Sequence, residues 1–403
     1  FMDDVQRGTI SMVDESTFAV GKNLATAPGA VVYRNELLEL IQYTPTTETV
    51  HEVPILLVPP WINKYYILDL GPKKSLIRYL TGQGFTVFTV SWKNPGADLR
   101  GITLDDYMLK GVGEAVEAAR EITGAKHVHL TGYCIGGTIV ACYMAWMNRT
   151  PGSRKALPVQ HWTTLATLVD FENPGDVDVF ISEAGIASLE KRMAREGYLD
   201  GSDMAGTFRM LRANSLIWHY WVRNYLYGEK PRAMDVLYWN MDTTRMPEAM
   251  HAFYLREFYL ENKLSRKDGV TLGGRKIDLG RISQPLYAVG TEQDHIAPWV
   301  ETFKVCQLVK SPVRYALSTS GHILGIINPP VDPPKRQYWA GEASGADAPE
   351  AWKSGLEEVP GTWWDDWVAW LRPQCGERVA PPGLGSAHHP RLADAPGTYV
   401  LER

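Results

Sequence analysis

One cysteine stands in a pattern that is typical of a catalytic nucleophile. Cys134 is the centre of Gly132-Tyr133-Cys134-Ile135-Gly136, which matches the Gly-x-nucleophile-x-Gly turn. An apolar run before it predicts a strand and the run after it predicts a helix, as this turn requires. The glycines make room for a strained turn, and the helix start favours a thiolate. We therefore predict that Cys134 is an acyl-accepting nucleophile and that the Ile135 amide points at the oxyanion.

Such a nucleophile needs a general base and an acid that orients the base. In the chain order of α/β-hydrolases the acid comes first and the histidine second, each just after a late strand. Asp294 and His322 occupy these two positions. His295 is the alternative base and Glu292 the alternative acid. The pattern thus predicts a triad of Cys134, His322 and Asp294, with two named competitors.

The loop at residues 59–70 follows the first predicted strand, where hydrolases place a second oxyanion donor. We expect a backbone amide near Ile62 or Asn63 to serve there, although a purely structural loop is the alternative. The remaining histidines show no ligand spacing, and the four cysteines form no Cys-x-x-Cys pair. The sequence therefore predicts no metal site and no bound cofactor.

The segments that would position these residues alternate between strand and helix patterns. Short apolar or β-branched runs predict strands, while capped, periodic runs that end at glycine predict helices. Such alternation predicts an α/β protein with a mostly parallel sheet flanked by helices. Together with the nucleophile turn and the order of the acid and the histidine, it predicts the α/β-hydrolase fold. The strands are expected at 54–60, 85–92, 127–133 and 161–171 and within 284–298 and 313–322, and the helices at 75–84, 103–124 and 137–149.

The alternation stops at residues 172–280, which are mostly helical or irregular and rich in aromatic residues. We expect this segment to be a mainly helical cap, or lid, inserted between two strands. It would divide the core into a first part at 1–171, with the nucleophile turn, and a second part at 281–403. The second part would carry the Asp and His loops and a surface tail. Near the end, tryptophans at helical spacing predict a buried helix face, and they are Trp363, Trp364, Trp367 and Trp370.

The composition argues against several classes of function. The 403 residues carry a net charge of −5 without a basic block, so nucleic-acid binding is not expected. The longest apolar run near the start, residues 53–62, is too short to span a bilayer and holds three prolines. Four cysteines in so long a chain are typical of a reducing compartment. The chain begins with Phe, so we expect it to be part of a longer product.

Several longer motifs resemble one known family, the polyhydroxyalkanoate synthases. The resemblance is closest to class I, which acts as a single kind of subunit on short-chain monomers. It runs from about residue 5 to the final APGTYVLER, without the family's N-terminal region. The motifs that carry it are GYCIGGT, VPPWINKYYILDL, VSWKNP, DFENPGDVDVF, TEQDHIAPW and SGHILGIINPP.

The resemblance implies a specific chemistry. Cys134 would be the acylated nucleophile, His322 the general base and Asp294 its acidic partner. The substrates would be (R)-3-hydroxyacyl-CoA thioesters, and CoA would be released as a polyester grows into granules. CoA would thus be part of the substrate and not a cofactor. The active form would be a cytoplasmic homodimer at the granule surface.

Two other interpretations of the same residues stay open. A thioesterase, acyltransferase or polyester depolymerase would use the same triad and differ only in the acceptor of the acyl group. A non-catalytic granule-coating protein would use its aromatic surfaces, and Cys134 would then be a buried structural thiol. The cysteine favours polymerisation, because an acyl thioester stays reactive enough to pass its acyl group to an alcohol.

Overall fold

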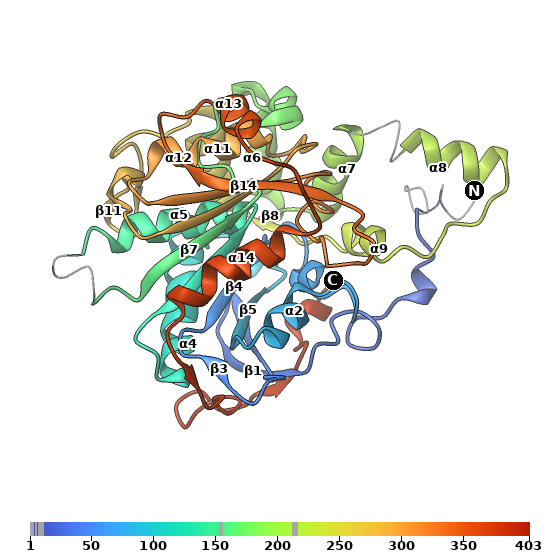
Figure 1. Ribbon diagram of the computed structural model, residues 1–403. Helices are drawn as coiled ribbons and strands as arrows, with labels where there is room; N and C mark the ends of the chain where they lie inside the picture. Colours follow the sequence, from blue (N-terminus) through green and yellow to red (C-terminus); the bar gives the residue numbers. More distant parts are fainter. Residues whose placement is uncertain (1–3, 5, 7–11, 151, 153–155, 212–216) are drawn as a thin grey trace.

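The centre of the computed structural model is a large twisted sheet (Figure 1). The structure describes residues 4, 6, 12–150, 152, 156–211 and 217–403. Within them the sheet has the strand order β15-β14-β13-β12-β7-β6-β4-β5-β2-β1-β17. The strands are β1 (Gly29–Arg34), β2 (Leu38–Tyr43), β4 (Ile55–Val58), β5 (Val87–Trp92), β6 (Val128–Tyr133), β7 (Val159–Leu165), β12 (Leu286–Thr291), β13 (Val313–Ser318), β14 (Gln337–Ala343), β15 (Val359–Pro360) and β17 (Ala393–Asp394).

The strands from β13 to β5 in this order are parallel, and the strands outside them are antiparallel. The predicted α/β-hydrolase fold with a mostly parallel sheet is therefore confirmed. One strand is shorter than predicted, because β7 ends at Leu165 and not at residue 171. Ala166 has a φ of 43°, a left-handed conformation that cannot continue a strand.

Helices cover both faces of the sheet, as predicted, and the strand residues alternate between two hydrophobic cores. In β4, Leu56 and Val58 face one core while Ile55 and Leu57 face the other. The predicted helix at 103–124 contains a π-helical stretch, η4, so it is not one continuous α-helix. The first core is covered by α3 (Leu104–Asp106), η4 (Tyr107–Gly113), α4 (Glu114–Thr123), α5 (Ile135–Met147), α11 (Trp299–Phe303) and α12 (Val305–Leu308), and the second by α2 (Leu76–Gly82) and α14 (Trp363–Leu371).

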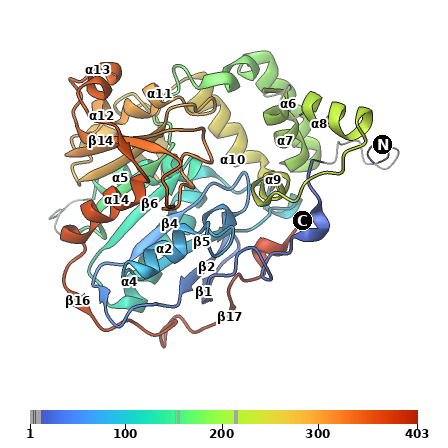
Figure 2. The same ribbon diagram turned by 45° about the vertical axis from the view of Figure 1, so that its right-hand side comes forward.

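A largely helical segment lies between β7 and β12, where the cap was expected. Figures 1 and 2 show α7, α8 and α9 on one side of the molecule, with α8 far from the sheet. Residues 212–216 of the predicted cap lie outside the described residues, and its bounds stay a prediction. Its elements are α6 (Glu183–Glu196), β8 (Tyr198–Leu199), α7 (Gly201–Leu211), α8 (His219–Trp221), η8 (Val222–Leu226), α9 (Asp235–Met241), β9 (Met246–Pro247), α10 (Glu248–Phe253), η9 (Tyr254–Leu260), β10 (Thr271–Leu272), β11 (Arg275–Lys276) and η10 (Leu279–Arg281).

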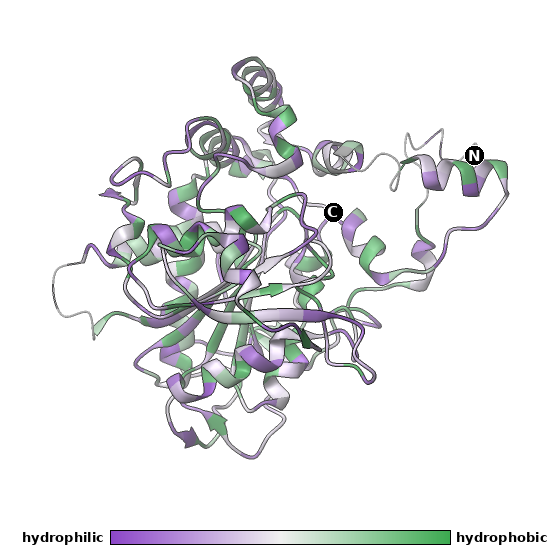
Figure 3. Ribbon diagram, turned by 45° about the horizontal axis from the view of Figure 1, so that its top comes forward, coloured by the Kyte–Doolittle hydropathy of each residue, from purple (hydrophilic) through white to green (hydrophobic). Residues whose placement is uncertain are grey.

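The hydropathy colouring matches this layered core, since Figure 3 shows green, apolar residues concentrated in the central strands. The helices around them mix green with purple, as expected of elements with one buried face. Among the described residues, no helix combines the length and the apolar character that a bilayer crossing needs.

The C-terminal part confirms one prediction and adds strand pairing to another. On α14, Trp363, Trp364 and Trp367 are fully buried and Trp370 is partly exposed, as expected for a packed helix face. The tail after it does more than cover the surface. One short strand, β16 (Arg378–Val379), pairs with β3 (Val50–His51), and β17 pairs with β1. The tail therefore adds a strand to the sheet edge.

We expect Trp364→Ala to destabilise the protein by about 3 to 5 kcal/mol, because it leaves a cavity where a buried indole stood. It also leaves the Ile326 carbonyl without the indole N–H that donates to it at 2.9 Å. Urea unfolding followed by circular dichroism measures the change. The control is Trp218→Ala, where the side chain is 56% exposed and the loss should stay within about 0.5 kcal/mol. Equal losses in both variants would contradict the assignment of α14 to the core.

Candidate active site

Cys134 occupies a strained turn between a central strand and a buried helix. It has φ 54° and ψ −125°, β6 ends just before it and α5 begins just after it. The two neighbouring glycines are sterically required. A Cβ on Gly132 would overlap the backbone of Gly137, and a Cβ on Gly136 would overlap the carbonyl oxygen of Val58. The sharp turn predicted from the sequence is thus present, and its thiol is half-buried.

Asp294 and His322 follow the adjacent strands β12 and β13 and contact each other. The Asp294 Oδ2 atom lies 2.7 Å from His322 Nδ1 and accepts a 2.9 Å hydrogen bond from the Thr291 hydroxyl. The other carboxylate oxygen accepts bonds of 2.9 Å from the backbone amides of Ile296 and Ala297. Every one of these contacts stabilises the ionised carboxylate and fixes its direction.

The charges of the site determine which nitrogen of His322 faces the thiol. Burial raises the pKa of Asp294, but the His322 charge and the hydrogen bonds outweigh it, so this pKa falls below its usual value. An ionised carboxylate can only accept, so His322 Nδ1 carries the proton. Burial lowers the pKa of His322, but Asp294 and Cys134 raise it well above the usual value, by charge and hydrogen bonding. Asp294 and Cys134 therefore favour the protonated form of His322, which is the form that exists once the histidine has taken the thiol proton.

Glu292 and the His295 backbone have other contacts in the structure. The Glu292 carboxylate forms an ion pair of 2.5 Å with Lys353. His295 follows Asp294 directly, and its carbonyl accepts a 2.9 Å bond from the Asp176 amide. It is His322 that contacts the Asp294 carboxylate. Cys134, Asp294 and His322 are thus brought together, while their catalytic role stays a prediction.

The predicted oxyanion donors lie on two segments that meet at the nucleophile turn. Ile135 is the first residue of α5, so its amide has no acceptor within the helix. The loop with Ile62 packs against the segment after α9, where the Ile62 carbonyl accepts a 3.2 Å bond from Thr244. The Asn63 amide side chain donates to the Asn240 carbonyl at 3.2 Å. The donor roles of the Ile135 and Ile62 amides stay predictions.

A buried lysine holds this loop in place. The Lys64 side chain is only 4% exposed and lies 2.7 Å from the Asp242 carboxylate. It also donates to the Glu402 carbonyl at 2.7 Å. The Tyr66 hydroxyl donates to Asp242 at 2.8 Å, and the Asn94 amide donates to the Glu402 carboxylate at 3.1 Å. The oxyanion loop, the inserted segment and the C-terminal residues thus form one hydrogen-bonded clamp.

Sequence analysis missed several aromatic residues around the site. The Tyr133 ring stacks on His322, with 5.7 Å between centroids, and its hydroxyl donates to the His322 carbonyl at 3.0 Å. Tyr254 and Tyr259 come from η9, and both interact electrostatically with Cys134. Their spacing of five residues fits no α-helical face, so only the richness in aromatic residues hinted at them.

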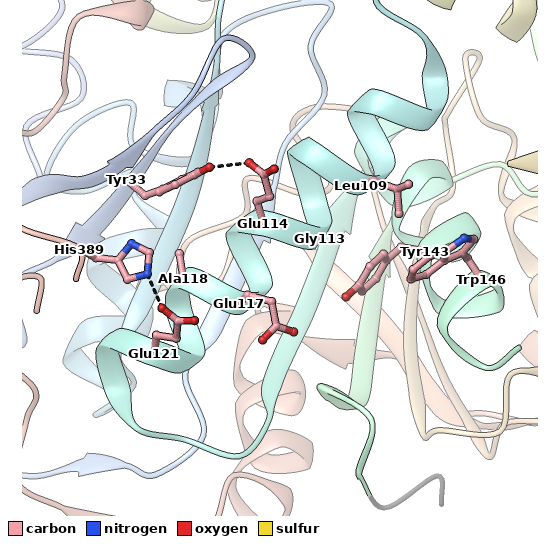
Figure 4. A pocket seen from close by; sticks show the side chains of 10 residues that line it. All are labelled: Tyr33, Leu109, Gly113, Glu114, Glu117, Ala118, Glu121, Tyr143, Trp146 and His389. Carbon is pink, nitrogen blue, oxygen red and sulfur yellow. Dashed lines mark hydrogen bonds and ion pairs between the residues drawn. The ribbon is translucent and has the colours of Figure 1, made fainter. Parts of the chain in front are cut away.

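A separate pocket of about 400 Å³ lies between β1, α4 and α5 (Figure 4). Two of its carboxylates already have partners within the protein. The Tyr33 hydroxyl donates to Glu114 at 2.5 Å, and His389 contacts Glu121 at 2.8 Å. The lining includes no residue of the predicted triad. Across the part of the chain that the structure describes, no three His, Cys, Asp or Glu side chains gather as metal ligands would.

Two family models match the chain. One is described as the Poly-beta-hydroxybutyrate polymerase (PhaC) N-terminus and matches residues 1–80, and the other is the alpha/beta hydrolase fold, at residues 54–329. The Poly(3-hydroxyalkanoate) polymerase subunit PhaC of Cupriavidus necator is 43% identical over 99% of this chain and 68% of its own length. The Poly(3-hydroxyalkanoate) polymerase of Methylorubrum extorquens is 46% identical over 97% of this chain. The chain spans 64% of the length of that second relative.

Among solved structures, a variant of an epoxide hydrolase from Bacillus megaterium has 14% sequence identity and a TM-score of 0.42. The match covers 74% of this chain and 94% of the other. A likeness this weak adds nothing to the assignment of the site.

We expect Asp294→Asn to change how stability depends on pH. Because folding raises the pKa of His322, its contribution to the free energy of unfolding is complete below about pH 6.5 and is lost as the pH rises through the raised pKa. The variant removes the carboxylate charge that raises this pKa, so its loss of stability above about pH 6.5 should be smaller. Urea unfolding at a series of pH values measures it.

The matched control is Asp98→Asn, which neutralises an exposed carboxylate outside the predicted triad and should leave the wild-type pH dependence unchanged. Identical pH profiles for the wild type and Asp294→Asn would contradict the charge coupling between Asp294 and His322.

Proposed function

Because this chain belongs to the poly(3-hydroxyalkanoate) polymerase family, we propose that it joins 3-hydroxyacyl groups from CoA thioesters into a polyester. We further propose (R)-3-hydroxyacyl-CoA of short chain length as the substrate. All the reacting groups of this proposal belong to the protein chain or to the thioester substrate. CoA enters only as part of the substrate and leaves as a product, and no separate cofactor is proposed.

The observation that supports this proposal best is the position of His322 between the Asp294 carboxylate and the Cys134 sulfur. In the first step, His322 Nε2 takes the Cys134 proton and the thiolate attacks the thioester carbonyl carbon. The Ile135 amide and an amide of the Ile62 loop hold the oxyanion. The bond from carbon to the CoA sulfur breaks, and His322 returns the proton to the departing CoA thiolate.

In the second step, His322 takes the proton of a 3-hydroxyl group, and the oxygen attacks the acyl-cysteine carbonyl. The bond from carbon to the Cys134 sulfur breaks as an ester forms, and the proton returns to the thiolate. The first step exchanges one thioester for another and is nearly balanced in energy. The second converts a thioester to an ester and is favourable, so the chain grows.

Water must stay away from the acyl-cysteine, because its attack would end the chain as a free acid. Tyr254 and Tyr259 of the inserted segment interact electrostatically with Cys134, and Phe171 of the loop after β7 packs against both rings. This is a physical means of excluding water while admitting an alcohol. In this proposal the inserted segment is a lid that opens to admit substrate.

We also propose the homodimer, the cytoplasm and the granule surface as the setting of this activity. The inserted segment exposes several large apolar side chains, of the kind that contacts with a partner chain or a polyester surface would bury. The exposed set includes Met210, Trp218, Leu226, Tyr227 and Met234. Light scattering at several protein concentrations tests the dimer.

The decisive experiment supplies (R)-3-hydroxybutyryl-CoA to the purified chain and measures free thiol and polymer together. We expect CoA release with long polyester from the wild type. Cys134→Ala should lower CoA release at least ~10³-fold, because no nucleophile remains. Cys142→Ala, at a deeply buried cysteine of α5, is the matched control and should retain CoA release if the variant folds.

Free hydroxy acid without polymer would favour a hydrolase instead. Unchanged CoA release from Cys134→Ala would overturn the acyl-cysteine mechanism. Absence of CoA release from a folded wild type would favour a granule-coating protein.

A further inference from the structure

Tyr133 connects the nucleophile turn to the loop that carries His322. It is the last residue of β6 and directly precedes Cys134, and its side chain is buried. Its hydroxyl donates a 3.0 Å hydrogen bond to the His322 carbonyl. Its ring stacks on the His322 imidazole, with 5.7 Å between the centroids and 30° between the planes. One side chain therefore contacts both the backbone and the ring of the proposed base.

This connection joins the ends of two strands that are not neighbours in the sheet. β12 and β7 lie between β13, which precedes His322, and β6, which precedes Cys134. At about 4.8 Å per strand, the axes of β6 and β13 are roughly 14 Å apart. Backbone pairing relates the two loops only through the strands between them, whereas the Tyr133 side chain joins them directly. The position of the base relative to the nucleophile thus depends on this tyrosine as well as on the sheet.

Three contacts orient the imidazole of His322. Asp294 Oδ2 lies 2.7 Å from its Nδ1 atom, the Tyr133 hydroxyl holds its carbonyl, and the Tyr133 ring packs on the imidazole. A hydrogen bond at one nitrogen alone would still let the imidazole tilt about that bond. The stacked phenol ring opposes this tilt. The direction of Nε2, the nitrogen that takes the proton in the proposed reaction, is therefore set by Asp294 and Tyr133 together.

Tyr133 also acts on the charge of the imidazole. A cation within about 6 Å of an aromatic centroid is attracted by the ring, so the stacked phenol favours His322 while it is protonated. Burial lowers the pKa of His322, while Asp294 and Cys134, the other titratable groups that act on it, raise this pKa. Burial, as the largest effect, raises the pKa of Tyr133 well above its ordinary value. The phenol therefore stays neutral and keeps the proton that it donates to the His322 carbonyl.

We propose that Tyr133 is a positioning residue for His322, which holds the imidazole in place through its hydroxyl and stabilises the protonated imidazole through its ring. This inference deepens the proposed function and rests on it, because His322 becomes protonated when it takes the proton of the Cys134 thiol or of the 3-hydroxyl group. Tyr133 transfers no proton itself and acts only through His322.

The test titrates His322 by NMR in the full chain with 13C-labelled histidine, and a His322→Gln variant identifies its signal by its absence. Tyr133→Leu removes the ring and the hydroxyl. We expect it to lower the midpoint of the His322 titration by about 0.5 to 1 pH unit, because the protonated imidazole loses the attraction of the ring. Tyr133→Phe keeps the ring and should leave the midpoint nearly unchanged.

The hydroxyl is tested by CoA release from (R)-3-hydroxybutyryl-CoA. Tyr133→Phe should lower kcat about 10-fold with little change in KM, because the base loses a hydrogen bond that orients it while substrate binding is unaffected. The matched control is Tyr287→Phe, which removes another buried tyrosine hydroxyl, one that donates to Asp366 at 2.9 Å. It should change neither kcat nor the His322 midpoint.

Circular dichroism shows whether each variant folds, and Tyr133→Met replaces Tyr133→Leu if that variant does not. An unchanged His322 midpoint in the folded variant would overturn the role of the ring, and an unchanged kcat in Tyr133→Phe would overturn the role of the hydroxyl. Equal effects of Tyr287→Phe would assign Tyr133 a merely structural role.

The NMR titration needs no thioester, so it separates this inference from the proposed function. A lowered midpoint in Tyr133→Leu together with a wild type that releases no CoA would overturn the proposed function and support the contact of Tyr133 with the protonated imidazole. Normal CoA release from the wild type with an unchanged midpoint in the variant would overturn this inference alone.

Discussion

The strained backbone of Cys134 is the constraint on which the rest of the site depends. A left-handed conformation at a residue with a side chain costs about 1 to 3 kcal/mol and persists only where its surroundings hold it. Here the Cys134 amide donates to the Leu165 carbonyl at 2.8 Å, and the Cys134 carbonyl accepts from Gly137 at 2.8 Å. One bond joins the turn to the neighbouring strand and the other to its helix. The strand and the helix therefore fix the direction of the Cys134 sulfur. The other residues of the site must be positioned around it by other segments of the chain.

The parallel sheet brings those partners to the sulfur. Parallel strands present their carboxyl ends at one edge, so the loops after β6, β12 and β13 open onto the same region. The pairing of Thr291 with Ser318 aligns the ends of β12 and β13, which sets Asp294 beside His322. The largest connection, between β7 and β12, starts at the same edge and carries Tyr254 and Tyr259. One sheet edge thus combines the nucleophile, its base and the start of the inserted segment.

The residues that could be predicted from sequence are those with a local signal. Cys134 lies in a glycine-flanked turn, and Asp294 and His322 each follow a short apolar run. A few neighbouring residues were therefore enough to predict each of them. Tyr254 and Tyr259 lacked such a signal, because their spacing departs from the 3.6-residue period on which helix prediction depends. The strand at 393–394 was missed because its partner Ala30 lies more than 300 residues away and no turn connects them. The register of the sheet strands and the contacts of the Lys64 clamp depend on tertiary packing, which local sequence patterns do not encode.

The clamp formed by Lys64 also affects the order in which the parts of the site assemble during protein synthesis. Lys64 and its partner Glu402 are 338 residues apart, and a chain is synthesised from its N-terminus. At about 5 to 20 residues per second, Glu402 is translated roughly 17 to 70 s after Lys64. During that interval the turn at Cys134 leaves the ribosome while the loop facing it lacks its last support. Completion of the clamp is therefore a late event of biosynthesis, because the Lys64 and Asn94 contacts with Glu402 form only after translation has reached that residue.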